Sequence, residues 1–163
     1  MSLVPISSLP PEAKAWCFGV SALPSDADVD RLREEMEVFL DRWTAHRADL
    51  RAGLEWLSDG FLVIAVDEST TGTSGCSIDA LTTEIRRLEQ TLGVDLLDAS
   101  PVWYRDSSGC VKRITREEFR QRAADGSITE DTRVFDLTVE HLDAIRSGDW
   151  EVEAGNSWHA RLL

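Results

Sequence analysis

The longest apolar run in the chain reads Phe-Leu-Val-Ile-Ala-Val and occupies residues 61–66. It stands between a Ser-Asp-Gly turn at 58–60 and an acidic pair at 67–68, which predicts a short strand buried on both faces. The preceding segment, 50–57, alternates in part between apolar and polar residues. This pattern predicts the other strand of a hairpin, and we expect the fold to be built around it.

A strand and a helix are predicted before this hairpin, and a second helix after it. The apolar stretch Trp16–Val20 predicts the strand, and apolar residues at helical spacing predict a helix from Asp26 to about His46. After the hairpin, Ser77 is the expected N-cap of a helix that ends at Gly93, since serine and glycine favour these two ends.

One more strand completes the predicted core, and either Val94–Leu97 or Val102–Arg105 can supply it. The resulting order, β-α-β-β-α-β, is that of an α+β ferredoxin-like fold: a four-stranded antiparallel sheet with two helices on one face. We therefore expect a lead-in segment over 1–13 and a ferredoxin-like core over 14–105. Residues 106–163 are expected to form a small β-hairpin–helix appendage and a tail that packs back on the core.

The net charge of the chain limits the classes of partner that we expect it to bind. Among 163 residues, 17 are basic and 30 are acidic, so the formal net charge is −13 with neutral histidines. Contacts to nucleic-acid phosphates or to anionic lipid require a basic face, which this balance disfavours. We expect neither a nucleic acid nor a membrane as partner. Only two basic residues are lysines, so the acidity fits either a high-salt source or an arginine-rich genome with a mildly acidic protein.

The cysteines and the N-terminus bear on the compartment. Cys17, Cys76 and Cys110 are odd in number and lack C-x-x-C spacing, which argues against a disulfide framework and a structural zinc site. The first residues lack the basic and apolar segments of a secretory signal, and no apolar run is long enough to span a bilayer. We therefore expect a cytoplasmic protein.

Signatures of common cofactors are missing from the sequence. The glycines of the segment 72–77 lack the lysine of a phosphate-binding P-loop, and no G-x-G-x-x-G follows a predicted strand. The H-E-x-x-H and G-x-S-x-G motifs are missing as well. We expect no cofactor and no metal site.

The 67–79 loop carries the most reactive side chains. Asp67 and Glu68 follow the buried strand, and Cys76 stands at the start of the next helix, where the helix dipole favours a thiolate. Either this is a polar site, or the loop merely caps the helix and Cys76 is a small buried residue. The residues expected to bind a ligand are Glu68, Ser74, Gly75, Ser77, Asp79 and Trp158.

Two histidines could serve this loop as a base. His46 is expected at the end of the first helix, and His159 lies in the aromatic tail beside Trp158. If the tail folds back beside the 67–79 loop, both histidines could approach Cys76. The alternative for His46 is that it only interacts with the dipole of the helix. The alternative for His159 is that it is a polar residue beside a tryptophan that docks the tail.

Two functions from different classes follow. The first is a binding or adaptor protein that uses the 67–79 loop and the aromatic tail to hold a protein or small-molecule partner. The alternative is a small thiol enzyme with Cys76 as nucleophile, His46 or His159 as base, and Asp67 as the residue that orients the base.

Five segments resemble a family of small bacterial proteins of unknown function. They are Trp43–His46, Phe61–Ser69, Ser74–Asp79, Val94–Asp98 and Ser157–His159, and the Gly-Cys-Ser-Ile-Asp block is the most specific. Some members carry the name "ABC transporter ATPase", which the missing P-loop lysine does not support here. The resemblance implies membership of a group but no mechanism.

Residues 102–136 are also similar to the small GYF-like modules. The similarity lies in an aromatic strand at Tyr104–Asp106, a short helix that starts at Thr115, and a turn and closing strand over 126–135. It implies binding of a peptide or protein partner, although the Gly-Tyr-Phe motif itself is absent from this chain.

Overall fold

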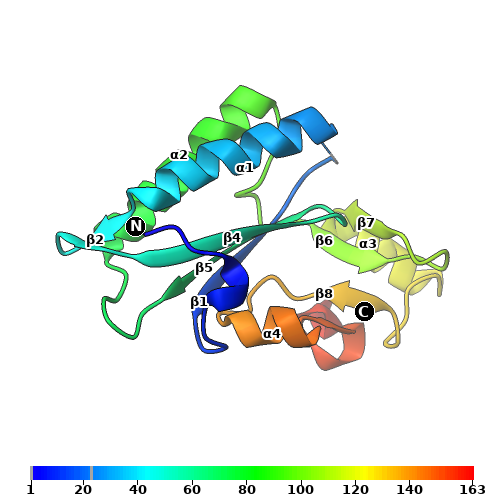
Figure 1. Ribbon diagram of the computed structural model, residues 1–163. Coiled ribbons are helices and arrows are strands. Elements are labelled where there is room, and N and C mark those ends of the chain that lie inside the picture. Colours follow the sequence, from blue (N-terminus) through cyan, green and yellow to red (C-terminus); the bar gives the residue numbers. More distant parts are fainter. Residues whose placement is uncertain (1, 23) are drawn as a thin grey trace.

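The computed structural model describes residues 2–22 and 24–163 (Figure 1). Its centre is a three-stranded antiparallel sheet in the order β1-β5-β4, with β1 at Lys14–Gly19, β5 at Phe61–Asp67 and β4 at Arg51–Leu57. Two helices, α1 (Asp26–Asp41) and α2 (Gly75–Leu92), lie side by side over one face of this sheet.

The predicted buried strand is confirmed as the middle of this sheet. Every residue from Phe61 to Val66 is fully buried, because β1 and β4 pair with its two edges and the rest of the chain covers both faces. Leu62, Ile64 and Val66 pack beneath the two helices, whereas Phe61 and Val63 face the opposite side. Continuous apolar sequence is what such a position requires.

The opposite face of the sheet is covered by the C-terminal part of the chain. Here a four-stranded sheet has the order β7-β6-β8-β9. Its strands are β6 (Val102–Arg105), β7 (Val111–Ile114), β8 (Arg133–Phe135) and β9 (Glu151–Glu153). Three aromatic side chains join the two sheets: the Phe61 ring lies 4.9 Å from that of Trp150 and 5.0 Å from that of Phe135.

Short helices complete the C-terminal part. They are α3 (Arg116–Ala124), α4 (Leu142–Ser147) and the 3-10 helices η2 (Ala154–Asn156) and η3 (Trp158–Leu162). A further 3-10 helix, η1 (Ile6–Ser8), lies near the N-terminus. Within the described part of the chain, no helix has the length and apolar character that crossing a bilayer requires.

The mixed α+β class is confirmed, but the strand order differs from the ferredoxin-like prediction. The core sheet has three strands, and neither candidate for the fourth joins it. Val94–Leu97 is an irregular segment with a bend at residues 96–97 instead of a strand, and Val102–Arg105 is β6 of the C-terminal sheet. On its outer edge, β1 makes a single antiparallel bridge within the described part of the chain, between Lys14 and His141.

Local corrections concern the ends of both helices. The first helix ends at Asp41 instead of reaching His46, because a tight hairpin follows, formed by β2 (Thr44–Ala45) and β3 (Ala48–Asp49). In the second helix Ser74, not Ser77, is the N-cap, since its hydroxyl accepts the Ser77 N–H. The capping of α3 by Thr115 is confirmed.

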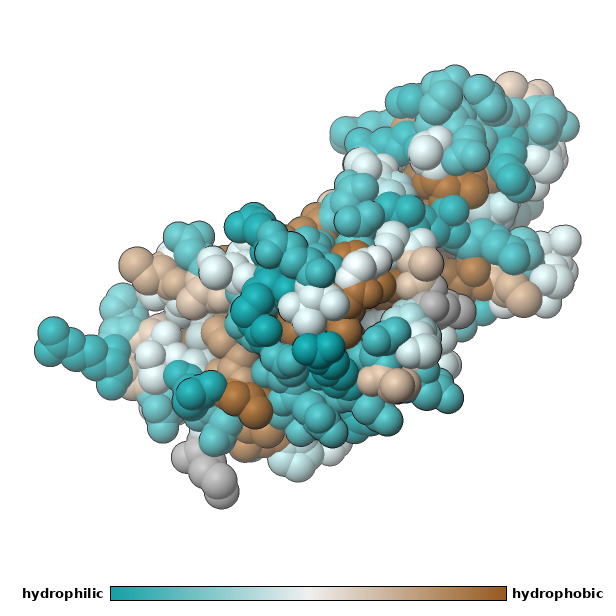
Figure 2. Space-filling model, turned by 90° about the horizontal axis from the view of Figure 1, so that it is seen from above, coloured by the Kyte–Doolittle hydropathy of each residue, from teal (hydrophilic) through white to brown (hydrophobic). Residues whose placement is uncertain are grey.

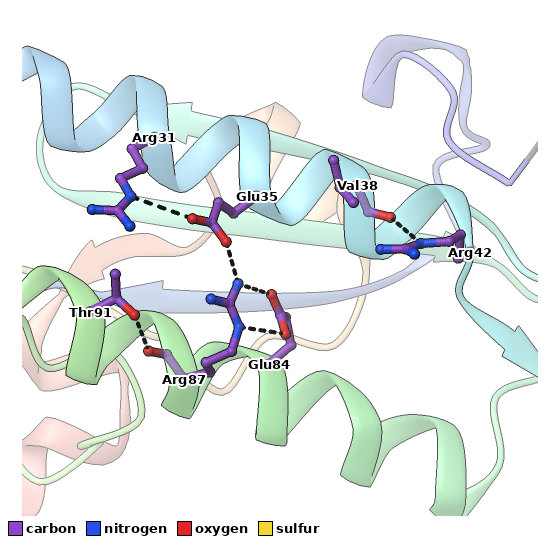
Figure 3. A network of polar contacts seen from close by, with 7 residues as sticks. All are labelled: Arg31, Glu35, Val38, Arg42, Glu84, Arg87 and Thr91. Carbon is purple, nitrogen blue, oxygen red and sulfur yellow. Dashed lines mark hydrogen bonds and ion pairs between the residues drawn. The ribbon is translucent and has the colours of Figure 1, made fainter.

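Ion pairs tie the outer surfaces of the two long helices together. Arg87 of α2 contacts Glu84 of its own helix and Glu35 of α1, and Arg31 reaches the same Glu35 at 3.4 Å (Figure 3). Glu35, Glu84 and Arg87 line a surface hollow of about 590 Å³ between α1 and α2. These three side chains already pair with one another, so they leave few unpaired charges for a ligand.

Candidate functional site

Asp67 at the end of β5 has structural partners. Its carboxylate accepts the Ser69 N–H at 3.0 Å and pairs with Arg51 at 3.1 Å. Hydrogen bonds from Ser69, with the Arg51 guanidinium beside them, hold the pKa of this carboxyl below its usual range. Asp67 is therefore an ionised group that fixes the loop to β4.

Glu68 organises the rest of the 67–79 loop. Its carboxylate accepts both the N–H and the hydroxyl of Thr73, at 2.8 and 2.5 Å. Burial alone raises the pKa of Glu68, but these bonds and the nearby Lys14 and His141 lower it overall. Lys14 also donates to the Thr73 hydroxyl at 3.4 Å, which connects the loop to the start of β1.

The start of α2 is a capping box, as the structural alternative for this loop predicts. Ser74 and Ser77 exchange side-chain-to-backbone hydrogen bonds of 2.8 and 3.2 Å. Gly75, Cys76 and Asp79 are exposed around this cap, so the expectation that Cys76 is a small buried residue is wrong. Across residues 2–22 and 24–163, no hydrogen bond joins the Cys76 thiol to a histidine or a carboxylate, so the structure does not assemble the predicted catalytic set.

The structure keeps the two candidate bases apart. His46 is exposed in the β2–β3 turn with a positive φ of 51°. His159 is fully buried in the C-terminal part, where its Nδ1 lies 2.7 Å from the Ser157 hydroxyl and its ring stacks on Trp158 at 3.8 Å. The tail packs against α3 and not against the 67–79 loop. A third histidine, His141, bridges to Lys14 and lies close enough to Glu68 of that loop to lower its pKa.

The strongest candidate site is the outer edge of β1. In the antiparallel register Trp16 pairs with Ile64 and Phe18 with Leu62, so these residues direct their N–H and C=O groups toward β5. Cys17 and Gly19 direct theirs outward. Among the described residues, neither has a recorded partner for these outward groups.

Neighbouring outward groups on both sides of this gap are paired. The Ala15 N–H donates to the Glu140 carbonyl at 2.8 Å, and the Ser21 N–H donates to the Asp95 carbonyl at 3.0 Å. The chain thus closes the two ends of the edge and leaves its middle open. This opening is the place that a fourth strand takes in a complete ferredoxin-like sheet.

The open edge is the floor of a groove of about 310 Å³. One wall is residues 96–99, whose Leu96 and Leu97 pack with Trp16 and Phe18 on the helix side of the sheet. The other wall is residues 137–140, whose Leu137 and Val139 pack on the opposite side. The groove therefore has an unpaired backbone at its base, and each flank combines apolar side chains with one acidic residue, Asp98 or Glu140.

A second hollow of about 320 Å³ extends the groove beyond Gly19. The two hollows share Ala99, Leu137 and Thr138 in their linings. Trp103 connects them, because its indole packs so closely on Gly19 that an added Cβ would lie 2.4 Å from the ring. The remaining lining is aromatic, aliphatic and cationic: Pro101, Arg116, Phe135, Trp158 and Arg161. Seen from above, apolar residues reach the surface at several places among hydrophilic ones (Figure 2).

No cluster of metal-ligating side chains occurs in the described ranges. The groove also reaches both parts that the sequence analysis selected. Lys14 and its partner Thr73 of the 67–79 loop stand at one end, and Trp158 of the tail stands at the other. Compared with known proteins, the chain matches no family model, no curated protein and no solved structure.

Proposed function

We propose that this chain is a binding protein that takes an extended peptide segment of a partner protein as an added strand on the edge of β1. The observation that carries the proposal is the pair of unpaired backbone positions, Cys17 and Gly19, at the base of a walled groove. Each offers one N–H donor and one C=O acceptor. Peptides that add a strand to a sheet gain affinity from such main-chain bonds and specificity from pockets along the edge.

Exposed sheet edges are normally blocked or covered, because they pair with other chains. Beyond Lys14, from Ala15 to Gly19, the edge carries neither a charged residue nor a proline. Buried backbone groups without partners cost about 1–3 kcal/mol each. A peptide that supplies those partners therefore binds with a gain that an already paired edge cannot give.

The walls of the groove favour a single peptide strand over the same edge of a second copy. Residues 96–99 and 137–140 flank β1 on both faces of its sheet. If two copies joined by their β1 edges, each would bring the same two walls to the interface. A lone extended segment fits between the walls without that conflict.

The test uses a library of random dodecapeptides displayed on phage, selected against the wild-type protein. Enriched peptides are synthesised with a fluorophore and their Kd values measured by fluorescence anisotropy. The test variant is Cys17→Pro, which removes the outward N–H at a position where an edge strand tolerates proline. Cys17→Ala is the matched control, because it removes the thiol and keeps the N–H.

We expect Cys17→Pro to raise the Kd of the enriched peptides at least tenfold and Cys17→Ala to leave it within about twofold. A second measurement does not depend on how well the proline variant folds. N-methylation of successive peptide residues should abolish binding at alternate positions only, as strand pairing requires. Peptides that bind Cys17→Pro as tightly as wild type, or that tolerate every N-methyl group, would overturn the proposal. A dimer that Cys17→Pro converts to monomer would also overturn it, in favour of a second copy.

A further inference from the structure

We infer that the end of the groove beyond Gly19 is a subsite for an acidic group of the bound peptide, placed next to an apolar side chain. This inference rests on the proposed function and names the chemistry of the partner. It is carried by Arg116 and Arg161, two cations that line the same hollow as Trp103 and Trp158.

The two guanidinium groups are not neutralised by the protein. The side chain of Arg116 donates to the Ser100 carbonyl at 2.9 Å and lies 4.9 Å from the Trp158 ring. Neither Arg116 nor Arg161 forms an ion pair with a carboxylate of residues 2–22 or 24–163, and no Asp or Glu lines this hollow. Other arginines of the chain also lack an ion pair among the described residues, but Arg116 and Arg161 stand out because both line one hollow that is otherwise almost entirely apolar.

The other residues of the hollow favour an apolar side chain next to the acidic group of the peptide. Trp103 and Phe135 are almost completely buried at its base, and Pro101, Leu137 and Trp158 complete the walls. A carboxylate held by arginine in such surroundings makes charge-assisted hydrogen bonds, which are about twice as strong as neutral ones. An aromatic or large aliphatic side chain beside it would cover the tryptophan faces.

The position of this hollow fixes where the acidic group must stand in the peptide. Trp103 packs on Gly19, the last residue of β1, and the two hollows share Ala99, Leu137 and Thr138. A strand that pairs with Cys17 and Gly19 therefore runs directly into the hollow. The acidic residue, or the terminal carboxylate of the partner, should occur at one constant distance from the paired residues.

The experiment compares peptides selected from the same dodecapeptide library on three forms of the chain. These are the wild type, the double variant Arg116→Met/Arg161→Met, and a control double variant Arg31→Met/Arg120→Met. Both double variants remove two positive charges, but Arg31 and Arg120 do not line the groove. Methionine keeps much of the aliphatic length of arginine, so the hollow retains its apolar filling.

We expect wild-type peptides to carry Asp, Glu or a free C-terminus at one constant position, beside an aromatic or aliphatic residue. On Arg116→Met/Arg161→Met their Kd should rise about tenfold or more, and on the control variant by no more than about twofold. Exchange of the acidic residue for its amide should cause a similar loss on the wild type and almost none on Arg116→Met/Arg161→Met.

The outcomes separate this inference from the proposed function. Peptides that are sensitive to Cys17→Pro but carry no acidic preference overturn the subsite and leave strand addition in place. Acidic peptides that bind Arg116→Met/Arg161→Met as tightly as the wild type overturn the subsite as well, since another group then reads the charge. Peptides that are indifferent to Cys17→Pro overturn strand addition itself.

Discussion

The two edges of the three-stranded sheet differ in how completely the rest of the chain pairs with them. On β4, the N-terminal segment lies alongside as a parallel neighbour: Ala52 donates its N–H to the Ser2 carbonyl and accepts the Val4 N–H, both at 2.8 Å. On β1, the chain pairs the two ends and leaves Cys17 and Gly19 without partners. One edge is thus protected by the protein's own backbone, and the other is held open between two walls.

The covered edge shows that this chain can close an edge where closure serves stability. The N-terminal segment buries Ser2 and Leu9 and places η1 against β4. Within residues 2–22 and 24–163, no comparable segment lies along the middle of β1, although residues 137–140 lead into the bridge with Lys14. An edge left open in this way is a hazard for aggregation unless a partner occupies it, which is why we assign it a binding role.

Hydrogen exchange should show the largest contrast between the edges. In the free protein, we expect the amides of Trp16, Phe18 and Ala52 to exchange more slowly than that of Cys17 by a factor on the order of 100 or more. The physical reason is that the amides of Trp16, Phe18 and Ala52 are hydrogen-bonded, whereas that of Cys17 has no partner among the described residues. Two-dimensional NMR during exchange into D₂O measures this. Equal protection of Cys17 and its neighbours would mean that the edge is closed.

Gly53→Ala should cause the largest loss of stability. An added Cβ would lie 2.7 Å from the Val4 carbonyl oxygen and 2.9 Å from the Ile6 Cα, so the backbone that covers β4 would have to move. We expect the free energy of unfolding to fall by about 3 kcal/mol, the upper part of the range for overpacking. Urea denaturation followed by circular dichroism checks this value. Unchanged stability would show that the N-terminal segment does not hold its place on β4.

Acid should weaken the wall at the far end of the open edge. Burial lowers the pKa of His159 to about 4, with the nearby Asp136 and Arg116 acting in opposite directions. The neutral ring is therefore favoured in the fold, and the unfolded chain takes up the proton first. The resulting loss of stability starts below the unfolded pKa, near 6.5, and amounts to roughly 2 kcal/mol by pH 5.

Two variants isolate this histidine. His159→Phe should flatten the decline of the unfolding free energy between pH 6.5 and 5, whereas the exposed His141→Gln should leave the decline as it is. Urea denaturation at both pH values gives the comparison. A decline of the same size in His159→Phe would exclude His159 as its source, since carboxylates with lowered pKa values, such as Asp67 and Glu151, destabilise the fold only at lower pH.

Much of the core could be predicted because its signals are local. Residues 61–66 are apolar at every position, and only the middle of a covered sheet accommodates such a run. The apolar stripe that predicts the first helix includes Leu32, Met36 and Leu40, the three residues of α1 that are buried. The caps of α2 and α3 follow from serine and threonine at helix starts, although Ser74 and Ser77 exchange roles.

The open edge could not be predicted, because local sequence does not say which sheet a strand joins. Val102–Arg105 has the composition of a buried strand and is one, but its partners are β7 and β8 instead of β1. The prediction of a complete sheet therefore concealed the groove. The sequence did carry one signal: it offered two stretches for the fourth strand, and neither was clearly the better candidate. Such an ambiguity is expected when the fourth position of the sheet is left empty. His141 approaches the 67–79 loop because it bridges to Lys14. The two bridged residues lie far apart in the sequence, so local sequence could not predict this contact.

Gly19→Ala provides the matched test on the open edge and should cost less than Gly53→Ala. The added Cβ would meet the Trp103 ring at 2.4 Å, so a side chain has to move and the backbone does not. We expect a loss of about 1–2 kcal/mol in the free energy of unfolding. Gly75→Ala is the control, because its Cβ would meet nothing within 4 Å and should be neutral or slightly stabilising.

The two alanine substitutions together decide how each edge is held. If Gly19→Ala costs as much as Gly53→Ala, the Trp103 ring is as firmly fixed as backbone, and the groove beyond Gly19 is a rigid, preformed site. If Gly19→Ala costs nothing, the ring yields readily, and the subsite forms only as a peptide enters. The expected intermediate cost corresponds to a ring that packing against Phe61 holds in place, at a centroid distance of 6.4 Å, but that can still adjust to a bound side chain.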